Sequence, residues 1–395
     1  MDDRRFYQRI IPISLGLFIL LTGCATVNLP GVAQEGFEIL DDEQRVFNRT
    51  DELNEEIDQS GMLFEDPELE QYLTELTQGL LPDSFNADHI HIEVKLIKDP
   101  VINAYAMPTG RIYMNSSMIA LMDNEAQLCA VLAHELTHIL ERHVLKVKRS
   151  TENKSAFFSS ISLLGPISIL GQMTAVTGFS QQIEYQADEG GFKRLTAKGY
   201  DPREAVALFQ RVKQFVDEED IDTPLFFSSH PGIRGRIVNF EQLLGEQAAN
   251  INPGGKTSAG EFKEKTRKLK LAAVQQWINT GMYITALDRV EHYLKDYPLD
   301  AEASRMKGDI YRKRVITKEN PKRKEKDKED YHLAVAAYDE AVKLDPQEAL
   351  ALRSKGIALQ KLGQTQEAAE AYRAYLDRVP DAVDKQYFEG VIHGR

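Results

Sequence analysis

His134, Glu135 and His138 stand in the order H-E-x-x-H within a largely apolar stretch of the chain. A helix advances about 100° per residue, so both histidines lie on one face and their ring nitrogens can converge on one ion. A catalytic zinc needs three protein ligands, a water that it activates, and a carboxylate that accepts the proton of that water. The pattern therefore predicts zinc ligation by His134 and His138, with Glu135 as the general base.

A third ligand is expected from an E-x-x-x-D sequence farther along the chain. Glu184 can complete a His, His, Glu ligand set on a second helix. Asp188 lies one turn later and can accept the other ring N–H of a ligand histidine. Alternatively, both carboxylates are ordinary surface charges, but the upstream motif favours their role in a site for one Zn²⁺ per chain.

Other residues of the motif helix have structural interpretations. Asn124, three residues before Gln127, is expected to cap its N-terminus. Cys129 lies on the side opposite His138, which favours a core thiol over a ligand. His143 follows His138 by five residues without the glycine of the longer H-E-x-x-H-x-x-G-x-x-H motif, and is assigned to the helix end.

Four segments together resemble the HtpX and CAAX-prenyl-protease family of zinc metallopeptidases: HELTHILERH, NAYAMPTGRIYMNSS, EYQAD and SSHPGIRGRI. The resemblance covers roughly residues 40 to 245 and implies a gluzincin-type endopeptidase domain. It suggests that His230 or Arg234 donates to the tetrahedral oxyanion, or that His230 occupies the open zinc position without substrate. A purely structural loop is the alternative. The chain departs from the family at Ser116-Ser117, where a glycine is common.

The N-terminus has the features of a lipoprotein precursor. Residues 1–23 combine early arginines with a short apolar run, which is typical of a signal peptide. Leu21-Thr22-Gly23-Cys24 resembles the bacterial lipobox, which implies lipidation of Cys24 and a lipidated tether over residues 24–40. A retained membrane anchor is the alternative. Ala25 favours an outer-membrane lipoprotein facing the periplasm of a Gram-negative bacterium.

Alternation and spacing predict the elements around the site. A helix is expected over residues 54–81, and a strand over 89–96 with His89 and His91 facing solvent. Strands near 101–107 and 111–115 flank a turn, and the first could pair with an extended peptide. The candidate substrate-binding residues are Asn103, Ala104, Tyr105 and Ala106. A purely structural hairpin is the alternative.

Two segments have unusual charge patterns. The acidic residues between Asp41 and Asp58 are interpreted as a solvated helix face. Residues 155–183 carry no charge, and a lid or a membrane-facing hairpin is favoured over a membrane span.

The C-terminal third contains a repeat. Ala334, Tyr338 and Pro346 recur 34 residues later, a period that resembles the tetratricopeptide repeat. An earlier unit is offset by 14 extra residues. The predicted organisation is a protease domain at 41–247, a linker at 248–262 and repeats at 263–395. The expected fold is α+β, mainly helical with a small antiparallel sheet, followed by an α-solenoid.

A formal charge of −13 argues against nucleic acid as a partner. The predicted function is a membrane-anchored periplasmic zinc metalloendopeptidase in quality control or assembly of envelope proteins. Its expected partners are misfolded or unassembled envelope proteins, the outer-membrane assembly machinery through the repeats, and the membrane through the lipid anchor. The rival hypothesis is a non-proteolytic chaperone or adaptor with a silenced zinc site.

Overall fold

The computed structural model of the chain describes residues 29–150, 179–219, 230, 232–248, 251–252, 254–315 and 324–394. The predicted signal peptide, the lipidation site Cys24 and most of the uncharged run 155–183 lie outside these ranges. Within them, none of the helices combines the length and the apolar character needed to cross a bilayer.

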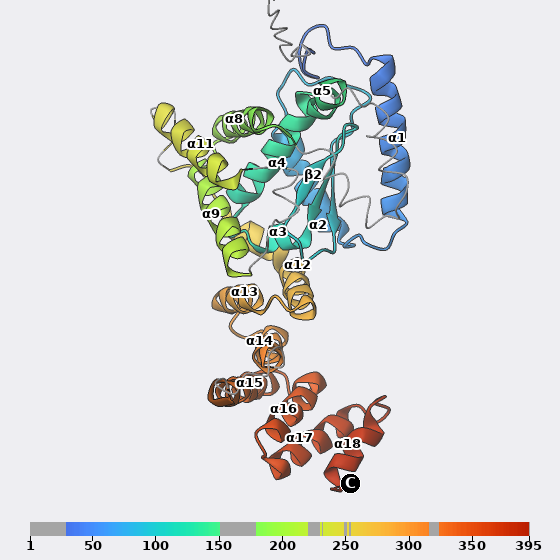
Figure 1. Ribbon diagram of the computed structural model, residues 1–395, viewed down its shortest axis with the longest axis vertical. Coiled ribbons are helices and arrows are strands. Elements are labelled where there is room, and N and C mark those ends of the chain that lie inside the picture. Colours follow the sequence, from blue (N-terminus) through green and yellow to red (C-terminus); the bar gives the residue numbers. More distant parts are fainter. Residues whose placement is uncertain are drawn as a thin grey trace, which may run out of the picture.

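Helices make up most of the molecule, and α4 runs through the centre of its larger end (Figure 1). Helices α12 to α18 follow one another away from that end toward the C-terminus. The mainly helical α+β fold with a helical C-terminal array is confirmed. In chain order the helices are α1 (Asp41–Asp58), α2 (Pro67–Gly79), α3 (Ser116–Ala120), α4 (Glu125–Leu140), α5 (His143–Ser150), α8 (Gln181–Ala197), α9 (Arg203–Glu218), α11 (Ile233–Glu246), α12 (Ala259–Thr280), α13 (Tyr283–Asp296), α14 (Ala301–Arg314), α15 (Lys324–Leu344), α16 (Ala349–Lys361), α17 (Thr365–Arg378) and α18 (Lys385–Ile392).

The sheet contains β1 (Glu93–Ile97), β2 (Ala104–Ala106) and β3 (Arg111–Asn115) in the order β1-β3-β2. β2 and β3 form the predicted antiparallel hairpin. β1 pairs with β3 in parallel, so the sheet is mixed rather than antiparallel as expected. The parallel pairing arises because β2 runs opposite to β1, and the turn after β2 gives β3 the direction of β1 again.

The first strand is shorter than predicted. Side chains alternate between exposed and buried from His89 onward, and His89 and His91 face solvent as expected. Regular pairing nevertheless starts only at Glu93. The alternation identified the buried face correctly but did not show where the partner strand begins.

The helix predicted over residues 54–81 is two helices, because α1 ends at Asp58 and α2 begins at Pro67. Asp66 caps α2, its side chain accepting a hydrogen bond from Leu69 N at 3.1 Å. Pro67 fits the first helical position, where no N–H is needed. The prediction of one continuous helix was therefore wrong.

The acidic segment forms α1, but two of its carboxylates are not merely solvated. Glu43 is buried and accepts hydrogen bonds from Arg142, directly after α4. Asp42 accepts hydrogen bonds from Arg149 of α5. These ion pairs fasten α1 to the C-terminal end of the central helix.

Glycine allows α4 and α8 to cross closely. A Cβ atom on Gly190 would lie 2.5 Å from Cγ2 of Thr137, and one on Gly191 would lie 3.3 Å from the backbone nitrogen of His134. Real side chains would force the helices apart. The two glycines therefore bring the E-x-x-x-D segment of α8 up to the H-E-x-x-H segment of α4.

Three helix pairs form the repeats: α12 with α13, α14 with α15, and α16 with α17. In the second and third pairs, a glycine of the first helix faces a tyrosine ring of the second. A Cβ atom on Gly308 would lie 2.5 Å from the ring of Tyr338, and one on Gly356 would lie 2.4 Å from the ring of Tyr372. Tyr338 follows Gly308 by 30 residues and Tyr372 follows Gly356 by 16. The 14 extra residues therefore lie between Gly308 and Tyr338, where about half of them lengthen α15, which has 21 residues against 14 in α17.

The predicted linker and the first repeat pack against the larger domain. Lys256 N donates to Gly199 O at 2.9 Å, and Ala126 N donates to Thr257 O at 3.3 Å. Phe262 and Trp277 are fully buried in the core that also contains α4. The end of the segment predicted as a linker is thus part of the packed structure.

Candidate metal centre

The helix that carries the motif is buried along its whole length. Asn124 caps it as predicted, accepting a hydrogen bond from Gln127 N at 3.0 Å. Cys129 is a buried free thiol whose pKa burial raises to about 12, in agreement with a core position. Because packing fixes α4 on all sides, its histidines have little freedom to move.

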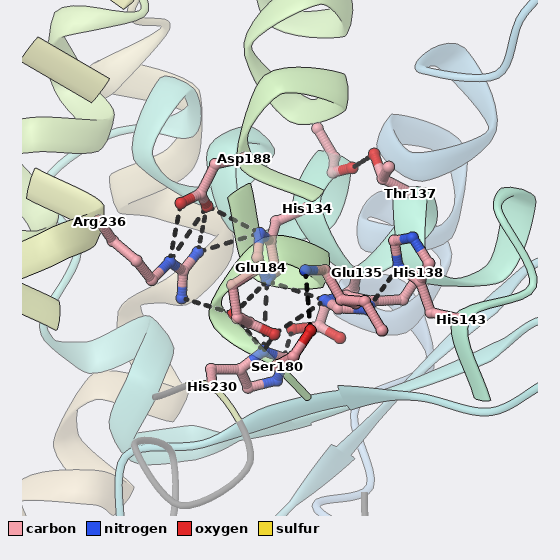
Figure 2. A network of polar contacts seen from close by, with 12 residues as sticks. His134, Glu135, Thr137, His138, His143, Ser180, Glu184, Asp188, His230 and Arg236 are labelled. Atoms are coloured by element: carbon pink, nitrogen blue, oxygen red, sulfur yellow. Dashed lines mark hydrogen bonds and ion pairs between the residues drawn. The ribbon is translucent and has the colours of Figure 1, made fainter. Parts of the chain in front are cut away.

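Four side chains from three parts of the chain meet at one point (Figure 2): His134, His138, Glu184 and His230. One ligand atom of each lies within 4.8 Å of all the others, and all four residues are buried. The Nε2 atoms of His134 and His138 are 3.1 Å apart, and Nδ1 of His230 lies 3.3 Å from Nε2 of His134. The carboxylate of Glu184 lies 3.1 Å from Nδ1 of His230.

This donor set fits a metal ion. Imidazole nitrogens with lone pairs repel one another at such distances unless a proton or a cation lies between them. Two or three histidines with one carboxylate are ligands that zinc takes in catalytic sites. The group therefore fits Zn²⁺, and it includes His134, His138 and Glu184, the three ligands expected from the sequence.

Asp188 orients the ring of His134 from the side that faces away from the cluster. Its Nδ1 atom lies 3.0 Å from Oδ1 of Asp188, which leaves Nε2 facing the cluster. Asp188 is in turn held by Arg236, whose Nη2 atom donates to Oδ1 at 2.7 Å. Arg236 is fully buried and its guanidinium lies over the ring of Phe209. Asp188 thus has the orienting position predicted for it.

Arg236, rather than Arg234, is the arginine at this site. Arg234 is exposed on α11, whereas Arg236 shares the buried face of that helix with Phe240 and Leu243. Positions 236, 240 and 243 follow the spacing of one helical face. That spacing was visible in the sequence and could have identified Arg236 as the buried residue.

The second histidine of the motif has a neighbour that the sequence analysis assigned only to the helix end. His143 is fully buried, and its Nδ1 atom lies 3.0 Å from Nδ1 of His138. The approach depends on Arg142, which has a φ of +55° and ends α4 so that α5 can begin in a new direction. Phe179 stacks on the ring of His138, with centroids 4.1 Å apart.

Glu135 lies beside the cluster with a buried carboxylate. Its Oε1 atom has no hydrogen-bond partner among the described residues and lies 3.5 Å from Nε2 of His230. A buried carboxylate oxygen without a donor lowers the stability of the fold, and a catalytic role is one reason why such a group is retained. Its place next to the three ligands fits a base that accepts a proton from a reacting water.

The pKa values of the two motif histidines are shifted in opposite directions. Burial and Arg236 act to lower the pKa of His134, but hydrogen bonds to Asp188 and Glu184 outweigh them and raise it to about 9. Burial and the neighbouring His134 hold the pKa of His138 well below its usual range. Burial alone would raise the pKa of Glu184, yet His230 and His134 keep it well below normal, so this carboxylate is ionised.

The four predicted substrate-binding residues lie on and just before β2, the outer strand of the sheet that faces α4. Asn103, Ala104 and Tyr105 are buried, and Ala106 is half-buried. Tyr105 stacks on Tyr113 of β3 with centroids 5.3 Å apart. Any contribution of these residues to substrate binding would come from the strand backbone rather than from exposed side chains.

Comparison with known proteins agrees with this geometry. Residues 67–244 match the model of peptidase family M48, and residues 325–383 match a tetratricopeptide repeat model. The chain is similar to the beta-barrel assembly-enhancing protease of Escherichia coli (strain K12), at 30% identity over 198 residues, 46% of this chain and 40% of that protein. The mitochondrial metalloendopeptidase OMA1 of Schizosaccharomyces pombe is 30% identical over 160 residues, 39% of this chain and 47% of that protein. The metalloprotease LoiP of Escherichia coli (strain K12) is 26% identical over 252 residues, 60% of this chain and 96% of that protein.

The matches to the first two relatives span less than half of their length. The family match includes the H-E-x-x-H motif, Glu184 and Arg236, all of which the structure brings together. The chain therefore carries a peptidase domain of family M48, followed by tetratricopeptide repeats.

Proposed function

We propose that this chain is a zinc-dependent endopeptidase. The observation that carries the proposal is the convergence of His134, His138 and Glu184 beside Glu135, whose buried Oε1 atom has no hydrogen-bond partner among the described residues. A purely structural zinc site would have no use for such a carboxylate.

Zinc, when bound, supplies an activated water and polarises the scissile carbonyl group. Glu135 accepts the proton of the attacking water and passes it to the leaving amine, which is general base and then general acid catalysis. Asp188 and Arg236 keep His134 in the orientation that points Nε2 to the ion. Burial of the whole cluster lowers the local dielectric constant, which strengthens each of these interactions.

His230 is proposed to close the site until substrate arrives. Its ring lies within reach of His134, Glu184 and Glu135 at once, so it fills the side of the cluster that a substrate carbonyl must approach. Once displaced, the same ring could donate to the developing oxyanion. His230 would thus first occupy the open zinc position and then donate to the oxyanion, within one catalytic cycle.

The activity is tested by Glu135→Gln, with Glu141→Gln at the end of the same helix as a matched control. Removing the base should lower casein and peptide cleavage by a factor of about 10² to 10⁴, with zinc content unchanged. Glu141→Gln should cleave like the wild type. A wild-type protein that binds zinc but cleaves nothing would favour the chaperone or adaptor hypothesis instead.

The gate is tested separately by His230→Ala. If the ring limits access, its removal should raise kcat/KM for a short peptide, because the open fraction no longer limits apparent affinity. A loss of activity with normal zinc content would instead show that donation to the oxyanion is its main role.

For the cellular role, we propose a lipoprotein of the outer membrane that degrades misfolded or unassembled envelope proteins. The lipobox-like sequence at Cys24 and the similarity to a beta-barrel assembly-enhancing protease support this proposal. The repeats would hold clients or the assembly machinery. Cys24→Ser should release the protein from the membrane fraction, and crosslinking of the Glu135→Gln protein should recover its clients.

A further inference from the structure

The segment between β1 and β2 is held by a residue of the first repeat. The indole Nε1 of Trp277 donates a hydrogen bond to the carbonyl oxygen of Pro100 at 3.0 Å. The neighbouring Gln276 accepts a hydrogen bond from Oγ of Ser116 at 3.0 Å. Trp277 is fully buried, so its hydrogen bond is made away from solvent.

The same segment is also held by the end of β3 and the start of α3. Nδ2 of Asn115 and Oγ of Ser117 both donate to the carbonyl oxygen of Val101, at 2.8 and 2.5 Å. Asn115 N donates to Asn103 O at 3.0 Å, directly before β2 begins. The segment that leads into β2 is therefore held by α12 of the repeats, by the last residue of β3 and by the start of α3.

These contacts matter because β2 itself is short. It has three residues and pairs with β3 alone, so its own ladder fixes its position weakly. The strand is at the edge of the sheet, next to β3, and lies beside α4, the helix that carries the metal ligands (Figure 1). A peptide that pairs with β2 would have its scissile bond placed by the distance between that strand and α4.

We infer that Trp277 and Gln276 are positioning residues for the substrate, acting through the segment that leads into β2. The inference rests on the proposed peptidase function and extends it, because it gives a repeat helix a part in placing the peptide. The packing of the tryptophan ring does not require this role. A phenylalanine would fill the same core, but it would leave the Pro100 carbonyl without its donor.

The first test uses Trp277→Phe and Gln276→Ala in the full chain, with Gln275→Ala as the control. Gln275 is half-buried, as Gln276 is, but its side chain donates to Asn279 of the same helix. Loss of one buried hydrogen bond should raise KM for a short extended peptide about two- to tenfold, with kcat changed less than twofold. The control should match the wild type. Unchanged KM in both variants, or a fall in kcat that follows zinc loss, would overturn the inference.

The second test leaves the junction unmodified. Trp277 is the single tryptophan of the chain, so emission excited selectively at tryptophan reports the surroundings of this side chain. In the Glu135→Gln protein, a saturating peptide without tryptophan should change the emission of Trp277. An unchanged spectrum at a concentration that blocks wild-type cleavage would overturn the inference. If the wild type cleaves no peptide but the emission still responds to one, the peptidase function fails, whereas the coupling of Trp277 to peptide binding stands.

Discussion

The first and the last repeat share one helix-pair plan but relate differently to the rest of the chain. The first buries Phe262, Leu269 and Trp277 in the core that also contains α4. The last closes a core of its own around Tyr372 and Phe388, at the far end of the molecule (Figure 1). The comparison shows that a boundary in sequence periodicity need not be a boundary in folding.

Polar contacts reinforce the difference. Thr285 N, at the start of α13, donates to Glu219 at the end of α9 at 2.7 Å. Arg289 and His292 of α13 lie 3.7 and 3.4 Å from Asp123, which precedes the motif helix. In a repeat array each unit is stabilised by its neighbours, and for the first repeat the peptidase domain is that neighbour.

The largest effect is expected from truncation. A chain that ends at residue 258 loses the buried side chains of α12, each worth about 1.5 to 3 kcal/mol, against a total stability of about 5 to 15 kcal/mol. It should fail to fold, whereas a chain that ends at residue 346 should keep its zinc site and hydrolyse short peptides. Zinc content and thermal unfolding of both chains measure this.

A folded, zinc-binding chain of 258 residues would contradict the shared core. Normal folding of the longer chain is also needed for any study of client recruitment. Truncation from residue 263 would disrupt the peptidase domain and the recruiting surface together, so the two effects could not be separated.

Two glycine substitutions with smaller expected effects test which repeats are coupled to the peptidase domain. Gly308→Ala and Gly356→Ala each press a methyl group into a tyrosine ring, at a cost of about 1 to 3 kcal/mol. Gly308 lies between Met306 and Ile310, which belong to the shared core. Its substitution should therefore lower the unfolding temperature of the peptidase domain and weaken zinc retention.

Gly356→Ala should lower only the transition of the last repeat. Calorimetry with a zinc-release indicator distinguishes the two outcomes. Equal shifts of a single transition in both variants would show that the whole chain unfolds as one unit.

The smallest effect concerns Lys270 of α12, whose amine lies over the ring of Phe262 at 4.7 Å. Burial lowers its pKa to about 8 from an ordinary 10.5. Between these two values the unfolded chain binds more protons than the folded one, so the free energy of unfolding rises with pH. The destabilisation caused by burying the charged amine is complete below pH 8 and is relieved as the pH rises toward 10.5.

Lys270→Met should therefore be more stable than the wild type at pH 7, by about 1 to 2 kcal/mol after loss of the cation–π contact. The advantage should shrink as the pH rises from 8 toward 10.5. Denaturant unfolding at both ends of this range measures it, and a difference that does not change with pH would place the amine in solvent.

Much of the metal centre was predictable because its ligands follow local rules. The spacing of His134 and His138, and the same-face pairing of Glu184 with Asp188, are properties of single helices. Arg236 was not predicted, because the motif resemblance pointed to Arg234 and the helical phase of α11 was not used. His143 was expected only at a helix end, because no helix places residues five apart on one face. An arginine does not indicate a turn with positive φ, so the change of direction at Arg142 could not be predicted.

The fold was predicted where signals are local and missed where they are not. Strands β2 and β3 were located from alternation and their turn, since hairpin pairing joins neighbours. The parallel pairing of β1 depends on tertiary packing, which alternation does not encode. The break between α1 and α2 had a local signal in Asp66-Pro67, and attention to capping would have found it.

The repeat with 14 extra residues keeps the same glycine-to-tyrosine contact as the repeat without them. Contact between α14 and α15 is therefore independent of the covalent connection that joins them, as expected when loop length adds little entropy. An engineered cleavage site between Arg314 and Lys324 would then yield two polypeptides that stay associated and can be reassembled from separate expression. Such a split chain would allow isotopes, probes or altered client-binding surfaces to be introduced into the C-terminal fragment alone.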